Sequence, residues 1–181
     1  MASDLLRATP TLCLGGAVAA ALLMGDAPGH GRTPPGALAL GVALSGGAAD
    51  IVATLLKECL FRPLYTHLGA DTLPILGRGP RPEGANRCGG WPYGPSGRSA
   101  APTRTFGLPS GHAACMCGML GFLLYQAKNG AGLGYMGLSV AGTLTLAVCI
   151  SRVVLGCHTI SQVAWGSSLG LALGWAAGGT I

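Results

Sequence analysis

Two histidines and an arginine stand at the ends of apolar runs, where titratable side chains are uncommon. His112 opens the apolar run of residues 113–125, Arg152 closes a second run, and His158 lies six residues later, just ahead of the last run. Neutral imidazole can attack phosphorus, protonated imidazole can donate a proton, and a guanidinium can bind phosphate oxygens in pairs. The spacing therefore brings side chains that could together act on a phosphoester to the ends of predicted helices.

Two short motifs carry a resemblance to a known family. Pro-Ser-Gly-His at residues 109–112, followed by Ser-Arg at residues 151–152 and by His158 after five more residues, resembles the signature of the type 2 phosphatidic acid phosphatase and vanadium haloperoxidase superfamily. That family has Lys-x6-Arg-Pro, then Pro-Ser-Gly-His, then Ser-Arg-x5-His-x3-Asp. The similarity covers residues 57–166, and the last two motifs, in this order and about 40 residues apart, are specific together.

The resemblance implies a role for each matching residue. His158 would be the nucleophile that forms a phosphohistidine, and His112 would be the general acid. Arg152 would hold phosphate oxygens. Ser110 and the backbone N–H of Gly111, at the start of a helix, would complete an anion site. The implied activity is hydrolysis of a lipid phosphate, of the phosphatidic acid or polyprenyl phosphate type, with no metal or other cofactor.

The first family motif is altered in this sequence. Lys57 is followed by an Arg-Pro pair at Arg62 after four residues, and by another at Arg81 much later. In a helix a seven-residue step keeps two side chains on one side, whereas a five-residue step turns the second away. We therefore expect Lys57 and Arg81 to bind phosphate, with Arg78 as the second choice. The run around Arg81 resembles a divergent branch of the family found in large DNA viruses.

The third motif is altered at its last position, where Gln162 replaces the family's aspartate. That aspartate accepts the imidazole N–H and stabilises the charged ring. The glutamine carbonyl can accept the same hydrogen bond but brings no charge, and its amide end can favour the wrong tautomer; a comparable change in serine proteases lowers turnover by about 10⁴. Two functions stay open, an active lipid phosphatase and a member that keeps the fold and binds lipid phosphate without turnover. A substitute carboxylate would have to come from Asp50, Glu58, Asp71 or Glu83, because no acidic residue follows Glu83.

The composition predicts a membrane protein. Only 9% of the 181 residues are charged, whereas a soluble domain has about 25%, and the mean hydropathy is positive. Seven of the eleven basic residues lie between Lys57 and Arg104, without the block or the interleaved aromatic residues of a nucleic-acid binder. This distribution suits anionic headgroups or phosphate, and nucleic acid is not an expected partner.

Five apolar runs predict a single all-α, multi-pass membrane helix bundle of about five to six helices over residues 1–181. The runs are residues 11–24, 35–56, 112–126, 131–150 and 160–181. The first is short for a span and has the alternative of a signal peptide. Asp50, inside the second run, is either a proton or headgroup ligand or a polar contact between helices.

The topology places the candidate residues together. An arginine-rich interfacial loop (residues 57–109), with one interfacial helix at residues 60–68, precedes the core motifs of residues 107–166. Alternating spans put Lys57, this loop, His112, Arg152 and His158 on one face of the membrane. The vanadate-binding branch of the family is soluble, so these spans argue against it, and an unrelated membrane scaffold would make the two spaced motifs coincidental. The other arginines and lysines favour a cytoplasmic position for this face: Arg7, Arg87, Arg98 and Arg104 lie on it, against Arg32 and Lys128 opposite.

The seven cysteines are odd in number and scattered through apolar runs. They predict neither a disulfide framework nor a paired zinc spacing. We interpret most of them as small hydrophobic residues in helix packing.

Overall fold

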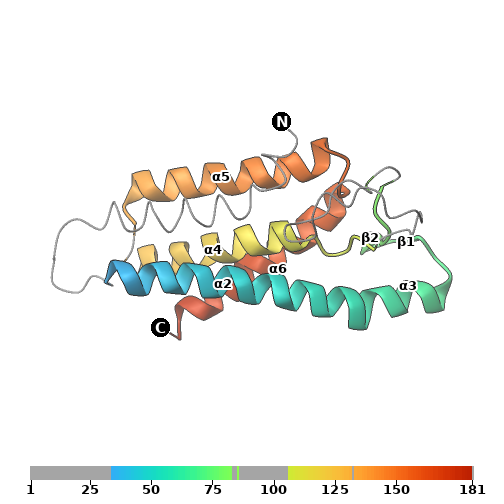
Figure 1. Ribbon diagram of the computed structural model, residues 1–181, viewed down its shortest axis with the longest axis horizontal. Coiled ribbons are helices and arrows are strands. Elements are labelled where there is room, and N and C mark those ends of the chain that lie inside the picture. The colour runs from blue at the N-terminus through green and yellow to red at the C-terminus, as the bar shows by residue number, and fades with distance from the viewer. Residues whose placement is uncertain (1–33, 83–84, 86–105, 132, 181) are drawn as a thin grey trace, which may run out of the picture.

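The computed structural model describes residues 34–82, 85, 106–131 and 133–180. Its helices run lengthwise beside one another, and a short hairpin lies at one end (Figure 1). Of the sequence predictions, the helix at residues 11–24 lies outside the described residues. The described elements, in chain order, are α2 (Pro35–Leu56), η1 (Lys57–Phe61), α3 (Arg62–Leu68), β1 (Thr72–Leu73), β2 (Gly77–Arg78), α4 (Gly111–Lys128), α5 (Tyr135–Val154) and α6 (Ile160–Gly178).

Helix α2, the π-helical turn η1 and α3 form one continuous helix. It begins with a proline in its first turn, where the missing N–H costs nothing. It does not stop at Lys57, as the apolar pattern predicted, because the Arg62 N–H donates to the Lys57 carbonyl and the chain continues through a wider turn. The helix ends at Gly69, whose φ of 61° is left-handed. The expected interfacial helix at residues 60–68 is the last part of this long helix.

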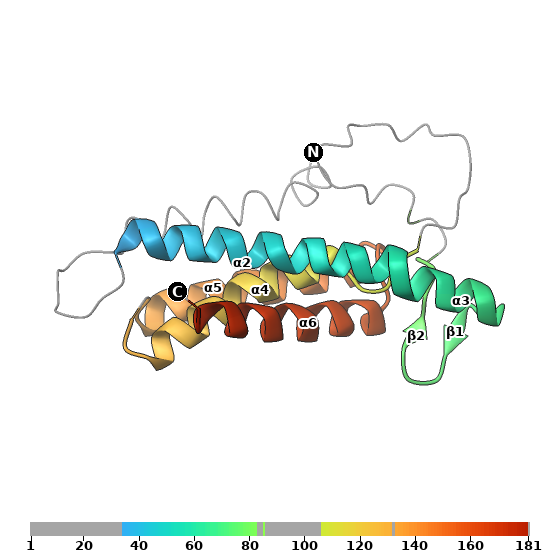
Figure 2. The same ribbon diagram turned by 90° about the horizontal axis from the view of Figure 1, so that it is seen from below.

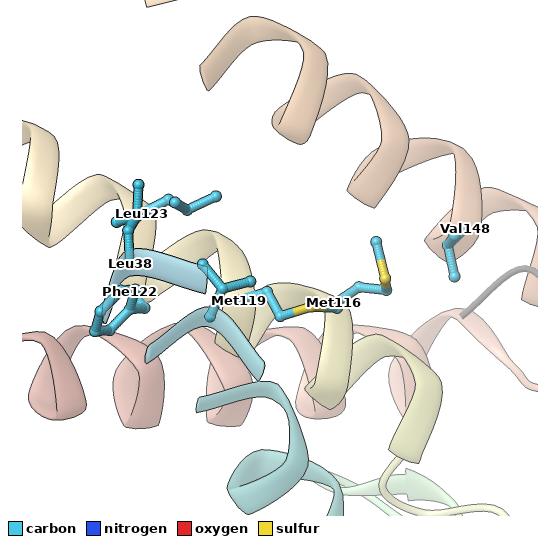
Figure 3. Close-up of a cluster of buried hydrophobic side chains, with 7 residues drawn as sticks. Leu38, Met116, Met119, Phe122, Leu123 and Val148 are labelled. Atoms are coloured by element: carbon cyan, nitrogen blue, oxygen red, sulfur yellow. The ribbon is translucent and has the colours of Figure 1, made fainter. Parts of the chain in front are cut away.

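Helix α4 lies at the centre of the bundle and packs against α2, α5 and α6. The buried positions of α2 recur every three or four residues, which directs one face of that helix toward α4. Side chains from three helices form the main apolar cluster (Figure 3). Its members are Leu38, Val42, Met116, Met119, Phe122, Leu123 and Val148.

A row of glycines brings α6 against α4. An added Cβ on Gly166, Gly170 or Gly174 would collide with the backbone carbonyl of Ser110, Ala114 or Gly118, respectively. Helices that lack side chains at their contact can approach backbone to backbone, as in many membrane bundles. The row therefore fixes the start of α6 next to the start of α4.

The hairpin is the exception to an otherwise helical chain within the described ranges. β1 and β2 pair antiparallel, with Thr72 opposite Arg78 and Leu73 opposite Gly77. The Tyr65 hydroxyl on α3 donates to the Gly77 carbonyl at 2.6 Å. The ring of Tyr65 also meets Phe106 edge to face, with 5.3 Å between centroids. These contacts hold the hairpin at the end of the bundle where α3 extends past α6 (Figure 2).

The remaining helix bounds differ modestly from the sequence predictions. α4 extends two residues past the expected end at residue 126, and α5 begins and ends four residues later than the expected 131–150. Two helices are long and apolar enough to cross a membrane by length and composition, Gly36–Leu68 and Tyr135–Val154. The chain is thus mostly helical with two candidate spans in its described part, and the five-span bundle stays a prediction.

Candidate active site

The first turn of α6 holds the histidine expected to be the nucleophile. Thr159 is the N-cap of α6, and its side chain accepts from the Gln162 N–H while the Gln162 side chain accepts from the Thr159 N–H, which forms a capping box. His158 directly precedes this cap and is 4% exposed. Its Nδ1 lies 3.2 Å from Gln162 Oε1. The altered motif position therefore keeps the contact with the imidazole.

The start of α4 lies directly against this turn. Ser110 is the N-cap of α4 and is fully buried. Its backbone N–H donates to the Gln162 carbonyl at 3.0 Å. The Asp50 carboxylate of α2 lies close to Gly111, the first residue of α4. His112 therefore follows a helix start that is hydrogen-bonded to the first turn of α6 and lies beside Asp50.

Arg152 occupies the last turn of α5 and is 2% exposed. Its backbone carbonyl accepts from the Cys157 and His158 N–H groups at 3.0 and 3.1 Å, so the chain turns back on itself and places His158 over the end of α5. Cys157 is disulfide-bonded, which the sequence analysis did not predict. Among the described cysteines, Cys115, Cys117 and Cys149 are free and at least partly buried, as helix packing would require, whereas the free Cys59 is exposed.

Positive charges meet beside these two helix starts. Arg81 is partly buried and interacts electrostatically with Arg152, and burial together with that charge lowers the pKa of the Arg81 guanidinium. Lys57 interacts with Arg81 and with Asp50. The Arg81 Nε is buried and has no hydrogen-bond partner among the described residues. A group of positive side chains that lie close together, with a buried N–H donor that lacks an acceptor, is typical of a site that binds an anion.

The other two arginines of the altered first motif lie differently. Arg62 forms an ion pair with Glu58 at 2.8 Å, and both side chains are well exposed. Arg78 lies in β2, and its backbone carbonyl, at 2.7 Å, accepts from Gln162 Nε2. Arg62 and Arg81 both interact electrostatically with Lys57, but Arg81 also interacts with Arg152. The expected role of Arg81 stays a prediction.

The environment of His158 keeps its imidazole neutral. Burial, followed by the charges of Arg81 and Lys57, lowers the pKa of His158 from the ordinary value to about 3. His112 interacts with Arg152, Arg81 and Lys57, so it shares the same field. A neutral imidazole at neutral pH retains a lone pair on one ring nitrogen and can act as a nucleophile.

A family model for the PAP2 superfamily matches residues 37–178. The chain belongs to this superfamily. Searches of curated proteins and of solved structures gave no match. Membership of the PAP2 superfamily indicates phosphatase-type activity on phosphorylated substrates.

The PAP2 motif residues come together at one end of the bundle. The residues that meet there are Lys57, Arg81, Ser110, Gly111, His112, Arg152, His158 and Gln162. In the part of the chain that the structure describes, no group of three His, Cys, Asp or Glu side chains is placed to hold a metal ion.

The sequence analysis missed two features of the site. The capping box could have been predicted, because Thr-x-x-Gln ahead of an apolar run is its usual pattern. The contact of Gln162 with the segment at residues 78–80 could not have been predicted, because the acceptors are backbone carbonyls, which every residue type carries.

Proposed function

We propose that this PAP2 superfamily member is a membrane phosphatase that hydrolyses a phosphomonoester or diphosphate of a lipid, of the phosphatidic acid or polyprenyl phosphate type. The observation that carries the proposal is the meeting of a buried neutral histidine, His158, with Arg81, Arg152 and Lys57. Phosphoryl transfer needs cations for the phosphate oxygens, a nucleophile in line with the leaving group and a proton for the departing oxygen. These groups supply all three together with His112.

The proposed reaction has two steps and needs no metal. The His158 Nε2 lone pair forms a bond to phosphorus, and the bond from phosphorus to the leaving oxygen, an ester in a monophosphate or an anhydride in a diphosphate, breaks with its electron pair on that oxygen. His112, protonated while the phosphate dianion is bound, gives that oxygen its proton. A water molecule then attacks the phosphohistidine, the P–N bond breaks, and His112 accepts the water's proton. Arg81, Arg152, Lys57, Ser110 and the Gly111 N–H would bind the oxygens throughout.

The level of the site along the bundle supports a lipid substrate. At about 1.5 Å per residue, the helix from Gly36 to Lys57 is about 31 Å long, and the hydrocarbon core of a bilayer is about 30 Å thick. If this helix spans the membrane, Lys57 lies at the level of the headgroups. His112 at the start of α4, Arg152 at the end of α5 and His158 before α6 lie at the same end of the bundle. A phosphate attached to an acyl or polyprenyl chain would meet them there.

The test is phosphate release by purified protein in detergent or nanodiscs, with a metal chelator present. Phosphatidic acid and a polyprenyl diphosphate are the two substrates. We expect release by wild type, and an acid-labile phosphoprotein after rapid quenching with ³²P-labelled substrate. His158→Ala should abolish both signals.

His67→Ala is the matched control, because His67 is an exposed histidine on α3 and should leave both signals unchanged. Release that survives in His158→Ala would contradict the proposed nucleophile. Wild type that binds inorganic phosphate but releases none from either substrate would indicate the alternative, a family member that binds lipid phosphate without turnover.

A further inference from the structure

Gln162 makes more contacts than an acceptor for His158 requires. Its side chain is fully buried at the first turn of α6. Oε1 lies 3.2 Å from His158 Nδ1 and accepts from the Thr159 N–H at 3.1 Å. Nε2 donates to the carbonyls of Arg78, Gly79 and Pro80 at 2.7, 3.1 and 2.9 Å. One amide therefore joins the nucleophile, the cap of α6 and the segment that leads to Arg81.

The surroundings fix which end of the amide faces which neighbour. Three carbonyl oxygens can only accept, so they require the NH2 group, and the Thr159 N–H can only donate, so it requires Oε1. If the amide were flipped, Oε1 would face the three carbonyl oxygens and the NH2 group would face the Thr159 N–H. Since Oε1 can only accept, His158 Nδ1 must carry the proton. The lone pair of neutral His158 then lies on Nε2, the nitrogen that the phosphohistidine reaction needs.

The segment held by Nε2 is tightly built. The Gly79 carbonyl also accepts from the Gly107 N–H at 2.8 Å, and Pro80 pairs with Phe106 in an isolated bridge. An added Cβ on Gly107 would lie 2.6 Å from Gln162 Oε1 and 2.8 Å from Nε2, so the amide fills its space. The next residue after the three carbonyls is Arg81.

An aspartate at this position would not reproduce these contacts. Its side chain is one methylene shorter, and a carboxylate facing three carbonyl oxygens would replace attraction with repulsion. The Gly79 carbonyl would keep its bond from the Gly107 N–H, whereas the Arg78 and Pro80 carbonyls would lose the Gln162 donor. The glutamine is therefore matched to the altered position of the phosphate-binding arginine, which this chain carries after the hairpin.

We infer that Gln162 is a positioning residue that couples the tautomer of His158 to the placement of Arg81, and that the chain needs glutamine at this position. The inference rests on the proposed function, which makes His158 the nucleophile and Arg81 a phosphate ligand. It goes beyond the expectation from the sequence that Gln162 supplies a hydrogen-bond acceptor to His158 without the charge of the family's aspartate. Restoring the family's aspartate should impair this protein.

The kinetic test compares Gln162→Glu and Gln162→Asp with wild type. Both variants keep a carbonyl-type acceptor but lose the NH2 group that donates to the carbonyls of residues 78–80. Because this segment leads to Arg81, it should then hold Arg81 less firmly. We expect KM to rise and kcat/KM to fall at least about tenfold. A carboxylate beside the ring also raises the pKa of His158 from its low value, so the acidic limb of kcat/KM should move to higher pH.

Gln126→Glu is the matched control. Gln126 is also a buried glutamine, and it donates to the Gly178 carbonyl at the other end of the same helix pair. It should lower thermal stability without moving the pH profile. Gln162→Asp or Gln162→Glu with wild-type KM and an equal or higher kcat would overturn the inference.

Two measurements separate this inference from the proposed function, because neither needs turnover. Histidine ¹⁵N NMR of the detergent-solubilised protein at pH 7 should show a neutral ring with its proton on Nδ1, and this signal should vanish in His158→Ala. Binding of inorganic phosphate, measured by calorimetry, should weaken several-fold in Gln162→Glu and stay unchanged in Gln126→Glu. A proton on Nε2, or unchanged phosphate affinity, would refute the coupling even in an active enzyme. If the NMR and phosphate-binding results are both as expected but the protein releases no phosphate, the coupling between His158 and Arg81 stands and the proposed phosphatase activity is refuted.

Discussion

Replacing Arg81 with alanine removes the guanidinium that the altered first motif places beside the two histidines. The side chain is partly buried, its buried Nε has no hydrogen-bond partner among the described residues, and it interacts with Arg152 and His158. A phosphate that enters the site would give this group its missing acceptor. The variant should therefore lose binding in both the ground state and the transition state.

The size of the loss follows from burial. Truncating one partner of a buried, hydrogen-bonded charge pair costs about 2–5 kcal/mol. In the free protein, however, removal of Arg81 also relieves repulsion with Arg152 and Lys57, which offsets part of that cost. Since about 1.4 kcal/mol corresponds to a factor of ten, we expect the lower half of the range, a decrease in kcat/KM of about 30- to 300-fold.

Arg62→Ala is the matched comparison. Arg62 carries the same charge and also precedes a proline, but it pairs with Glu58 on the surface. Exposed pairs contribute about 0–1 kcal/mol, so kcat/KM should change by less than about fivefold.

The assay is initial-rate phosphate release from phosphatidic acid in mixed micelles at constant surface concentration, for wild type and both variants. Arg81→Lys should fall between wild type and Arg81→Ala, because lysine keeps the charge but not the planar pair of donors. Loss in Arg62→Ala equal to that in Arg81→Ala, or a change below threefold in Arg81→Ala, would refute the assignment of Arg81.

Three further predictions concern stability, each measured as an apparent Tm in detergent. Gly170→Ala should lower the free energy of unfolding by about 1–3 kcal/mol, because its Cβ would collide with α4, whereas Gly142→Ala, which meets nothing within 4 Å, should be neutral or slightly stabilising; equal Tm values would argue against the close contact. Thr159→Ala should cost about 1 kcal/mol through loss of the α6 cap, Thr159→Ser should restore most of it, and an unchanged Tm in the alanine variant would contradict the capping box. The pKa of His158 is about 3 in the folded protein and 6.5 ordinarily, so between these pH values the unfolded chain binds more protons than the folded chain. The contribution of His158 to the free energy of unfolding is therefore complete above pH 6.5 and is lost as pH falls toward 3. The Tm of wild type should drop more between pH 7 and 5 than the Tm of His158→Gln.

The sequence predicted helices where hydrophobicity alone determines them. The bounds of α2 match the expected residues 35–56, because a proline starts the run and lysine ends its apolar part. The apolar pattern could not show that the helix continues to Leu68, because continuation depends on backbone hydrogen bonds and not on hydrophobicity. α5 begins at Tyr135 after Gly134 as its N-cap, a position that the apolar composition of residues 131–150 did not locate.

The motif residues of the candidate site were predictable because their spacing is characteristic. His112, Arg152 and His158 lie at helix ends as the apolar runs predicted, and helical geometry argued against Arg62, which the structure places in an exposed ion pair. What joins these residues was not predictable. The partners of Gln162 Nε2 are carbonyls more than 80 residues away in the chain, and only the folded backbone brings them near.

The disulfide bond at Cys157 bears on which compartment the site faces. Disulfides form and persist in oxidising compartments and at cell or virion surfaces, whereas the cytosol keeps thiols reduced. Cys157 directly precedes His158, so the bond and the proposed nucleophile would lie in the same compartment. The arginine count predicted the cytoplasmic side, but long loops cross a membrane largely regardless of their charge. A disulfide bond beside the proposed nucleophile is an argument against that cytoplasmic prediction.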